Sequence, residues 1–281
     1  MNLLLAAVLL ALAAPGGVSV KHDLTFAAGP RGKLDVYLPG TPAPGAPVAV
    51  FIYGGAWQSG DKGLYRFVGT TLASRGILTV IPDYRVYPQV RYPDFLRDNA
   101  LAVRFVKQHA REWGGDPARL FLIGHSAGAY NVAMLALDRR WLGEVGLDPR
   151  RDVAGVVGLA GPYDFLPLRD EKLRIIFGPK DMRPDTQPMN HVDGQAPPML
   201  LLAGSKDYVV NPGNTTRLAA AIQRSGGEAE ARLYPGIDHD GVLTAILSPL
   251  RHRAPVLAAI VDFVTLHAAA PGPTPVAKVA A

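Results

Sequence analysis

The chain has 281 residues, nearly half of them hydrophobic, with many glycines and prolines and no cysteine. This length suits one large α/β domain or two small ones, and the missing cysteine excludes disulfides, thiolate nucleophiles and cysteine-based zinc sites. The formal net charge of +5 comes from scattered basic residues, which indicates a solvated, mildly basic surface, and we expect no nucleic-acid partner.

The first segment of the chain is typical of an export signal. Residues 3–14 form an unbroken apolar run that ends in Ala11-Leu-Ala-Ala14. Its length suits a signal peptide and is too short to span a bilayer. We predict a signal peptide over residues 1–20 and a periplasmic or secreted protein. No Lys or Arg precedes the run, so a retained apolar helix on a cytoplasmic protein is the alternative. Without cysteine we expect no lipoprotein anchor and no other stable membrane anchor.

After this leader, short apolar runs alternate with helical segments. A Gly-Pro-Arg-Gly turn over 29–32 separates the first two expected strands, and a Pro/Gly/Ala-rich loop over 39–47 follows them. Further along, β-branched apolar runs predict buried strands, and apolar residues at helical spacing predict helices. The expected strands cover 23–26, 33–38, 48–53, 77–81, 120–123, 153–159, 199–203 and 231–234, and the expected helices cover 62–74, 95–113, 129–137, 211–225 and 255–267.

This alternation predicts the fold class. Fully apolar strands that alternate with helices indicate an α/β protein with a mostly parallel central sheet covered by helices on both faces. Residues 161–198 interrupt the alternation with a proline-rich, charged segment, which we expect to form a small insertion or partial cap after the sixth strand. A Pro/Ala-rich stretch within 269–281 is expected to be a disordered tail, so the predicted domain spans 21–268. The sequence does not indicate the oligomeric state.

The motif Gly124-His-Ser-Ala-Gly128 carries the functional prediction. It fits G-x-S-x-G and lies between an expected strand and an expected helix. A Ser between two glycines at such a turn is a nucleophile elbow, because the glycines allow a tight turn that lifts the hydroxyl above the sheet edge. We therefore predict that Ser126 is a nucleophile.

A Ser hydroxyl needs a base to take its proton and a carboxylate to orient that base. After this kind of elbow the acid comes first along the chain and the His second. His239 directly follows the last expected strand and is the predicted base, with His191 in the insertion as the second candidate. Asp207 lies just past an expected strand, at the carboxyl end where parallel sheets place their sites, and is the predicted acid. Asp164 is its rival.

The reaction also needs backbone N–H groups at the position where negative charge develops. Ala127 follows the nucleophile and is one expected donor. The glycine-rich loop Tyr53-Gly-Gly-Ala-Trp57 follows an early strand, and within it we predict Gly55 and Ala56 as the other donors of the oxyanion hole. Four aromatic residues near these motifs are expected to line a substrate pocket, namely Trp57, Tyr130, Tyr163 and Phe165.

Together these motifs resemble the α/β-hydrolase superfamily. The resemblance is to the esterase/lipase branch with an H-G-G-x-W oxyanion motif, which includes small carboxylesterases and kynurenine-formamidase-like enzymes, and it runs from about residue 33 to about 266. It depends on Tyr53-Gly-Gly-Ala-Trp57, Ser59-Gly-Asp-Lys62, Asp83-Tyr-Arg-Val-Tyr-Pro88, Tyr92-Pro93, Asp98, Gly124-His-Ser-Ala-Gly128, Asp207 and His239. The branch usually has His where this chain has Tyr53, and there the His shapes the loop. We expect the Tyr53 hydroxyl to do the same.

The resemblance implies a serine hydrolase that cleaves small carboxylic esters, with a short acyl group, through an acyl-enzyme. It implies no metal and no organic cofactor, and it assigns acyl and alcohol specificity to the insertion 161–198. The same triad also serves amidases, formamidases and peptidases, and a non-catalytic binding protein on this fold is an alternative from another class. A lipase that acts on lipid surfaces would need a larger and more apolar lid than this insertion offers.

Overall fold

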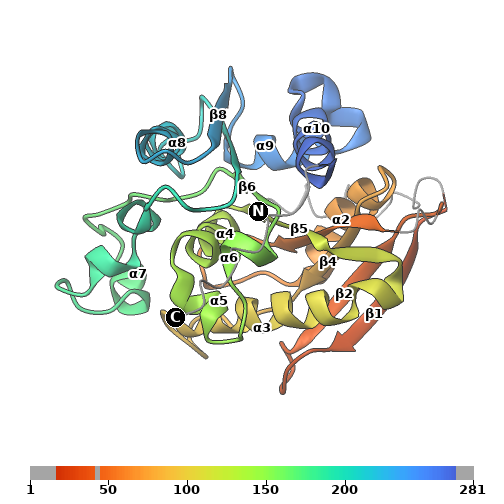
Figure 1. Ribbon diagram of the computed structural model, residues 1–281. Coiled ribbons are helices and arrows are strands. Elements are labelled where there is room, and N and C mark those ends of the chain that lie inside the picture. The colour runs from red at the N-terminus through yellow and green to blue at the C-terminus, as the bar shows by residue number, and fades with distance from the viewer. Residues whose placement is uncertain (1–16, 42–44, 270–281) are drawn as a thin grey trace, which may run out of the picture.

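The computed structural model describes residues 17–41 and 45–269, and its elements follow the expected order (Figure 1). The strands are β1 (Ser19–Thr25), β2 (Lys33–Leu38), β3 (Ala46–Ile52), β4 (Leu78–Pro82), β5 (Gly115–His125), β6 (Gly155–Leu159), β7 (Met199–Gly204) and β8 (Ala229–Tyr234). The α-helices are α2 (Arg66–Ala73), α3 (Asp94–His109), α4 (Ala127–Leu137), α5 (Arg139–Gly143), α6 (Pro149–Asp152), α7 (Glu171–Ile176), α8 (Gly213–Arg224), α9 (His239–Thr244) and α10 (Val256–Ala269). Short 3₁₀ helices are η1 (Lys62–Tyr65), η2 (Ala110–Trp113), η3 (Arg183–Thr186), η4 (Pro188–His191) and η5 (Ser248–Arg253).

Within the described residues, the strands form one sheet in the order β1-β2-β4-β3-β5-β6-β7-β8. The β1–β2 and β2–β4 pairs are antiparallel, and every pair from β4–β3 to β7–β8 is parallel. This confirms the predicted α/β-hydrolase fold class with its mostly parallel sheet. Because the strand order reverses around β3 and β5, a crevice forms at their carboxyl ends, where ligands bind in such sheets.

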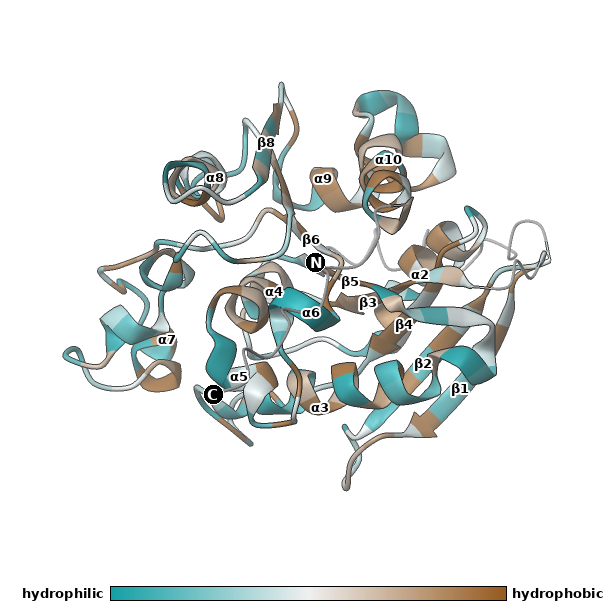
Figure 2. Ribbon diagram, viewed as in Figure 1, coloured by the Kyte–Doolittle hydropathy of each residue, from teal (hydrophilic) through white to brown (hydrophobic). Residues whose placement is uncertain are grey.

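Helices cover both faces of the sheet. In Figure 1 the helices α3, α4 and α8 lie on one side, and α2 and α10 lie on the other. The central strands are brown in Figure 2, and β4, β6 and β7 are buried along their whole length. The helix α4 is also buried at every position, because it packs against β3, β5 and β6 directly behind the nucleophile elbow. The elbow is therefore surrounded by packed structure on both sides.

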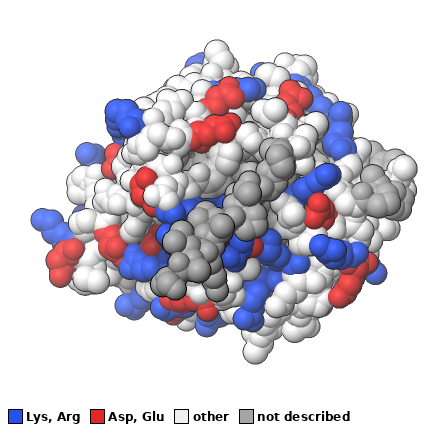
Figure 3. All heavy atoms as spheres, in the orientation of Figure 1, with Lys and Arg blue, Asp and Glu red and all other residues white. Residues whose placement is uncertain are grey.

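The surface carries charges of both signs. On the part of the face that Figure 3 describes, Lys and Arg side chains lie beside Asp and Glu side chains. Several of these groups form ion pairs, such as Arg97 with Glu144 and Arg139 with Asp148. Basic side chains on this face are therefore interspersed with acidic ones.

The structure differs from the expected elements in several places, and among the differences are the short helices α5 and α6 between α4 and β6, where no helix is expected. Strand β5 begins at Gly115, earlier than the apolar run suggests, and extends to His125. A short helix, α9, begins at His239 in a segment expected to be a loop. The segment 161–198 follows β6 as expected and contains α7, η3 and η4; α7 lies at the left of Figure 1, away from the sheet.

The two ends of the chain fall largely outside the described residues. Of the expected leader over 1–20 the structure describes residues 17–20, and Ser19 and Val20 already belong to β1, where they pair with Leu38 and Tyr37. Of the expected tail over 269–281 it describes only Ala269, the last residue of α10. Among the described helices, none has the length and hydropathy needed to cross a membrane.

Candidate active site

The nucleophile elbow joins β5 to α4. Ser126 has φ 54° and ψ −121°, a strained conformation for a residue with a side chain. Its N–H donates to the Leu159 carbonyl at 2.8 Å, and its carbonyl accepts from the Tyr130 N–H at 3.1 Å. A Cβ atom at Gly128 would lie 2.0 Å from the Ile52 carbonyl oxygen, so only glycine lets α4 begin this close to β3. The surrounding elements thus hold the Ser126 backbone in its strained form.

Ser126, His239 and Asp207 form one hydrogen-bonded chain. His239 Nε2 lies 2.9 Å from Ser126 Oγ, and His239 Nδ1 lies 2.7 Å from Asp207 Oδ2. A carboxylate only accepts hydrogen bonds, so Nδ1 donates to Asp207, and Nε2 is left with a lone pair toward the Ser hydroxyl. The structure therefore brings together the three side chains that the sequence predicts as nucleophile, base and acid.

Asp207 is held as a carboxylate. Its side chain is fully buried, and its Oδ1 accepts from the N–H groups of Val209 at 2.9 Å and Val210 at 2.8 Å. Burial alone would raise the pKa of Asp207, but the hydrogen bonds from His239, Val210 and Val209 outweigh it and keep that pKa below its usual range. Asp207 therefore stays charged at neutral pH and orients His239.

The loop before His239 is fastened to the loop after β7. Ile237 accepts a hydrogen bond from the Lys206 N–H at 2.9 Å, and the Gly236 N–H donates to Ser205 Oγ at 3.0 Å. Asp238 caps α9 by accepting from the Gly241 N–H at 2.7 Å. His239 is the first residue of this helix, and 12% of its side chain is exposed, so the ring is both fixed and accessible.

The two rival residues lie elsewhere. Asp164 forms an ion pair with Arg217, with Oδ2 2.9 Å from Nε. His191 Nε2 lies 2.7 Å from the Asp185 carbonyl oxygen. Among the hydrogen bonds of the described residues, Asp164 makes none to His239, and His191 makes none to Ser126.

The glycine-rich loop turns through three successive left-handed residues. The φ angles of Gly55, Ala56 and Trp57 are 128°, 52° and 57°, and the N–H groups of residues 58 and 59 both donate to the Gly55 carbonyl. A Cβ at Gly55 would lie 2.2 Å from the Ser59 carbonyl oxygen, so this turn requires glycine. In the described part of the chain, the N–H groups of Gly55, Ala56 and Ala127 donate to no other group of the protein. Ala56 and Ala127 line the same cleft as Ser126, whereas Gly55 does not.

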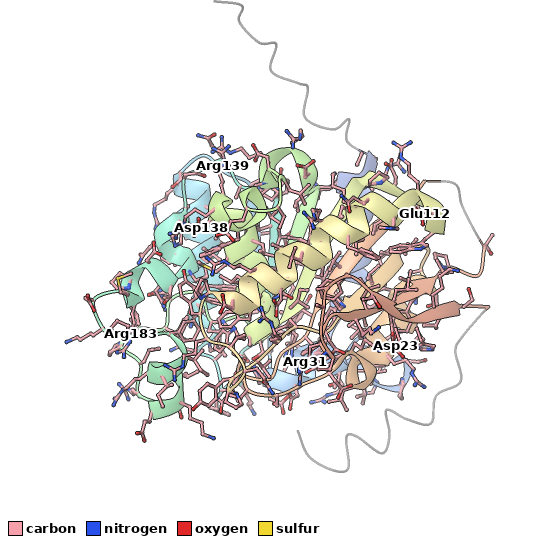
Figure 4. All side chains as sticks on the ribbon, turned by 90° about the horizontal axis from the view of Figure 1, so that it is seen from below. Asp23, Arg31, Glu112, Asp138, Arg139 and Arg183 are labelled. Atoms are coloured by element: carbon pink, nitrogen blue, oxygen red, sulfur yellow. The ribbon has the colours of Figure 1, made fainter. Side chains whose placement is uncertain are left out.

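Tyr53 anchors this loop through a network of polar groups around its hydroxyl. Its hydroxyl donates to Asp83 Oδ1 at 2.9 Å and accepts from Arg31 Nη1 at 3.1 Å. Arg31, labelled in Figure 4, comes from the turn between β1 and β2 and also donates to the Gly60 carbonyl at 2.9 Å. Burial raises the pKa of Tyr53 far above its ordinary value, so the phenol stays protonated and can donate. The ring also stacks on Tyr84, with 4.7 Å between centroids.

The Asp83–Pro88 motif links the loop to α3. The Tyr87 N–H donates to the Trp57 carbonyl at 2.8 Å. The Arg85 guanidinium binds both carboxylate oxygens of Asp98 on α3, at 2.8 Å and 2.6 Å. This bidentate pairing gives Arg85 of the Asp83–Pro88 motif and Asp98 of α3 a shared structural role.

The cleft beside Ser126 has a volume of about 1000 Å³. One wall comes from the insertion and the other from the loop 205–212 after β7. Two apolar side chains on that loop, Tyr208 and Val209, are 89% and 74% exposed. The residues that line the cleft include Ala56, Trp57, Phe165, Leu166, Leu168, Tyr208, Val209 and Arg217.

Two of the four expected pocket aromatics line this cleft, and two do not. Trp57 and Phe165 line it, and the ring centroids lie 6.1 Å apart. The prediction is wrong for Tyr130 and Tyr163, which are both fully buried. Tyr130 lies on the buried helix α4, where its hydroxyl donates to the Thr186 carbonyl at 2.7 Å. The Tyr163 ring packs on β6, where a Cβ at Gly158 would lie 2.0 Å from its hydroxyl.

Three further residues shape the site beyond those that the sequence predicts. Phe177 packs edge-on against Trp57, with 4.8 Å between centroids, and places the insertion on the glycine-rich loop 53–57. Arg31 joins the Tyr53 network from a turn that shows no functional signal. His125 was present within the G-x-S-x-G motif, and its position at the end of a buried strand was the available signal. Within the described residues, no group of three or more His, Asp or Glu side chains is arranged to bind a metal ion.

Comparisons with known proteins agree with this geometry. A model of the BD-FAE family matches residues 34–222. A protein of Arabidopsis thaliana named as a probable isoprenylcysteine alpha-carbonyl methylesterase is 31% identical over 242 residues, which are 78% of this chain and 51% of that protein. The chain spans about half of the length of the curated relatives it matches.

Solved structures resemble the chain along most of its length. A truncated carbohydrate esterase from gut microbiota has a TM-score of 0.79 at 20% identity, with 90% of this chain and 97% of that one covered. Esterase 2 of Thermogutta terrifontis has a TM-score of 0.68 at 26% identity, with 91% and 93% covered. The similarity to the carbohydrate esterase, at 20% identity, shows the fold alone. The similarity to esterase 2, at 26% identity, is also a similarity in sequence.

Proposed function

The chain belongs to the BD-FAE family, and from this membership we propose that it is a serine hydrolase of carboxylic esters. The observation that carries the proposal is the hydrogen-bonded chain from Asp207 through His239 to Ser126. Such a chain gives a Ser hydroxyl the base it needs to act as a nucleophile at neutral pH. Names of relatives agree, since both the Arabidopsis protein and the Thermogutta protein are called esterases.

In the proposed acylation step, His239 Nε2 takes the proton of Ser126 Oγ while Oγ attacks the ester carbonyl carbon, which gives a first tetrahedral intermediate. Asp207 holds the ring in the tautomer that allows this and stabilises the imidazolium that forms. The imidazolium then passes the proton to the leaving alcohol as the C–O bond breaks. An acyl-enzyme on Ser126 and a free alcohol result.

Water completes the proposed cycle. His239 takes a proton from the water, whose oxygen attacks the acyl carbon and forms a second tetrahedral intermediate. This intermediate expels Ser126 Oγ, which recovers the proton from the imidazolium. The carboxylic acid leaves, and the enzyme returns to its starting state.

We propose that the N–H groups of Ala127, Gly55 and Ala56 stabilise the negative charge of both intermediates. Two observations support this proposal. Within the described residues these three N–H groups donate to no other group of the protein, and Ala56 and Ala127 line the cleft beside Ser126. An oxyanion-hole donor contributes about 10²–10³-fold to kcat in serine hydrolases. The Tyr53 network fixes the loop that presents two of them.

We propose small-molecule esters with a short acyl group as substrates. The aromatic cluster of Trp57, Phe165 and Phe177 fills space next to Ala56, which favours a small group beside the nucleophile. The part of the cleft that residues of the insertion and of the loop 205–212 line then accepts the alcohol part. On this account the insertion 161–198 sets specificity.

Hydrolysis of a p-nitrophenyl ester series from acetate to long acyl chains tests the proposal. We expect turnover that falls as the acyl chain lengthens. His239→Ala should lose on the order of 10⁴-fold or more in kcat, and His191→Ala is the matched control that should stay close to wild type. Absence of turnover on every ester would contradict the proposed function, and damage from His191→Ala alone would assign the base to His191.

We also propose that the protein is exported. Support comes from the apolar run 3–14 and its Ala-x-Ala ending, and a cut before Ser19 leaves β1 intact. Mass spectrometry of the protein from the periplasm or medium should show the loss of about 14–18 residues. A protein that retains Met1 and stays in the cytoplasm would contradict export.

A further inference from the structure

His125, the residue directly before the nucleophile, is a polar side chain in an apolar setting. It is the last residue of β5, where it pairs with Leu159 of β6, and only 4% of its surface is exposed. The proposed reaction gives it no role. A buried His that follows a run of four apolar residues needs a reason, because burying a polar ring without partners is costly.

The ring of His125 is bonded to the main chain of the proposed base. Its Nε2 lies 3.1 Å from the His239 carbonyl oxygen, and the two ring centroids are 5.0 Å apart. A carbonyl oxygen only accepts, so Nε2 carries the proton and donates. His125, the chain neighbour of Ser126, thus holds the main chain of His239, the proposed base that activates Ser126.

The other side of the ring faces the oxyanion loop. A Cβ at Gly54 would lie 3.2 Å from His125 Nδ1 and 3.0 Å from the His125 carbonyl oxygen, so the loop and the ring are in tight contact at this position. Nδ1 is buried and, within the described part of the protein, has no hydrogen-bond partner. Burial, and after it the nearby His239, lowers the pKa of His125 to about 3. The ring therefore stays neutral at working pH, with its one proton on the nitrogen that faces His239.

Hydrogen bonds of the loop before His239 fix the base from the side of the acid, and the buried residues of α9 that follow it anchor it to the core. The loop before His239 is bonded to residues 205 and 206, next to Asp207. Among the described hydrogen bonds, the one from His125 is what connects the main chain of His239 to the nucleophile elbow. The Nε2-to-Oγ distance joins these two parts of the structure, and the bond from His125 is a direct hydrogen-bonded link between them.

We infer that His125 is a positioning residue for the base: its Nε2–H bond to the His239 carbonyl sets the distance between His239 Nε2 and Ser126 Oγ. As a role in ester hydrolysis, this inference rests on the proposed function. Misplacement of a reacting group by about 1 Å can cost about 10²-fold in rate. Loss of the bond should therefore lower kcat and leave KM nearly unchanged, because His125 does not line the cleft.

Two substitutions of equal length test the bond. His125→Gln keeps an N–H donor that can reach the His239 carbonyl, and His125→Met removes the donor at similar size. On p-nitrophenyl acetate we expect the Met variant to lose about 10- to 100-fold in kcat at unchanged KM, and the Gln variant to stay within about threefold of wild type. Equal kcat values for the two variants would overturn the inference.

A second readout does not depend on turnover. The proton on His239 Nδ1, shared with Asp207, should give a far-downfield ¹H NMR resonance in wild type and in His125→Gln. In His125→Met we expect this resonance to broaden or shift, since the ring is less well fixed. An unchanged resonance in a folded Met variant would overturn the inference. Should wild type cleave no ester, the proposed function fails, while this resonance still decides the role of His125 in holding the ring.

Folding of the variants is checked by circular dichroism. If His125→Met does not fold, His125→Asn replaces it, because its shorter amide does not reach the His239 carbonyl. The inference then requires the Asn variant to behave as predicted for Met, in both kcat and the NMR resonance. An Asn variant with the kcat and resonance of wild type would overturn it.

Discussion

Acid should destabilise this protein through one buried imidazole. The ring of His125 is packed beneath Gly54 and against His239, and the titratable groups that face it are His239 and Asp207. Burial lowers the pKa of His125 to about 3, and the charge of His239 adds to this effect. In the unfolded chain the same ring has its ordinary pKa of 6.5 and takes up a proton readily.

The sign and size of the effect follow from this difference. Between pH 6.5 and about 3 the unfolded chain binds a proton at His125 that the folded protein does not bind, so the free energy of unfolding falls as the pH falls. The slope is about 1.4 kcal/mol for each pH unit, and the whole difference corresponds to about 5 kcal/mol. From pH 7 to pH 4, this ring alone should cost about 3 kcal/mol, a large share of the about 5–15 kcal/mol typical of folded domains.

Guanidinium chloride unfolding at pH 7 and pH 4 measures this change in the free energy of unfolding. The reference is His125→Gln, which keeps a donor but does not titrate. Carboxylates such as Asp207, whose pKa lies below its usual range, lose stabilisation equally in both proteins as the pH falls. We therefore expect wild type to lose about 3 kcal/mol more than the Gln variant between the two pH values. The same pH dependence in both would refute the reasoning, because it would mean that His125 protonates freely in the folded state.

Three further changes test other parts of the site. Asp207→Asn should lower kcat by about 10⁴-fold in ester hydrolysis because it disrupts the tautomer of the base, with Asp164→Asn near wild type; the reverse result would assign the acid to Asp164. Tyr53→Phe removes the hydroxyl between a carboxylate and a guanidinium, so denaturant unfolding should show a loss of about 1–3 kcal/mol, and an unchanged midpoint would contradict the anchoring network. Gly128→Ala places a Cβ 2.0 Å from a backbone oxygen of β3 and should prevent soluble expression, whereas Gly143→Ala, which meets nothing within 4 Å, should express normally.

The sequence predicts the three side chains that the structure brings together, because each of them follows a local rule. Ser126 sits in a motif whose glycines are required by close backbone contacts, and Asp207 and His239 lie in the loops that follow the strands β7 and β8. A parallel sheet brings the carboxyl ends of neighbouring strands to one edge, so residues 113 positions apart in sequence, such as Ser126 and His239, meet there.

The parts that were missed depend on contacts between distant segments. Tyr130 and Tyr163 lie near the motifs in sequence, but α4 and β6 turn both rings into the core. Arg31 reaches the oxyanion loop across 22 positions to Tyr53, and nothing in its turn signals this. His125 was visible in the motif, yet its bond to a carbonyl 114 positions away needs the fold.

The central claim is that Ser126 is the nucleophile of an ester hydrolase. The most direct test compares the hydrolysis of p-nitrophenyl acetate by wild type and Ser126→Ala under identical conditions. We expect steady turnover by wild type and a loss on the order of 10⁴-fold or more in kcat for the variant, with the same fold by circular dichroism. A Ser126→Ala variant that retains near wild-type activity would contradict it.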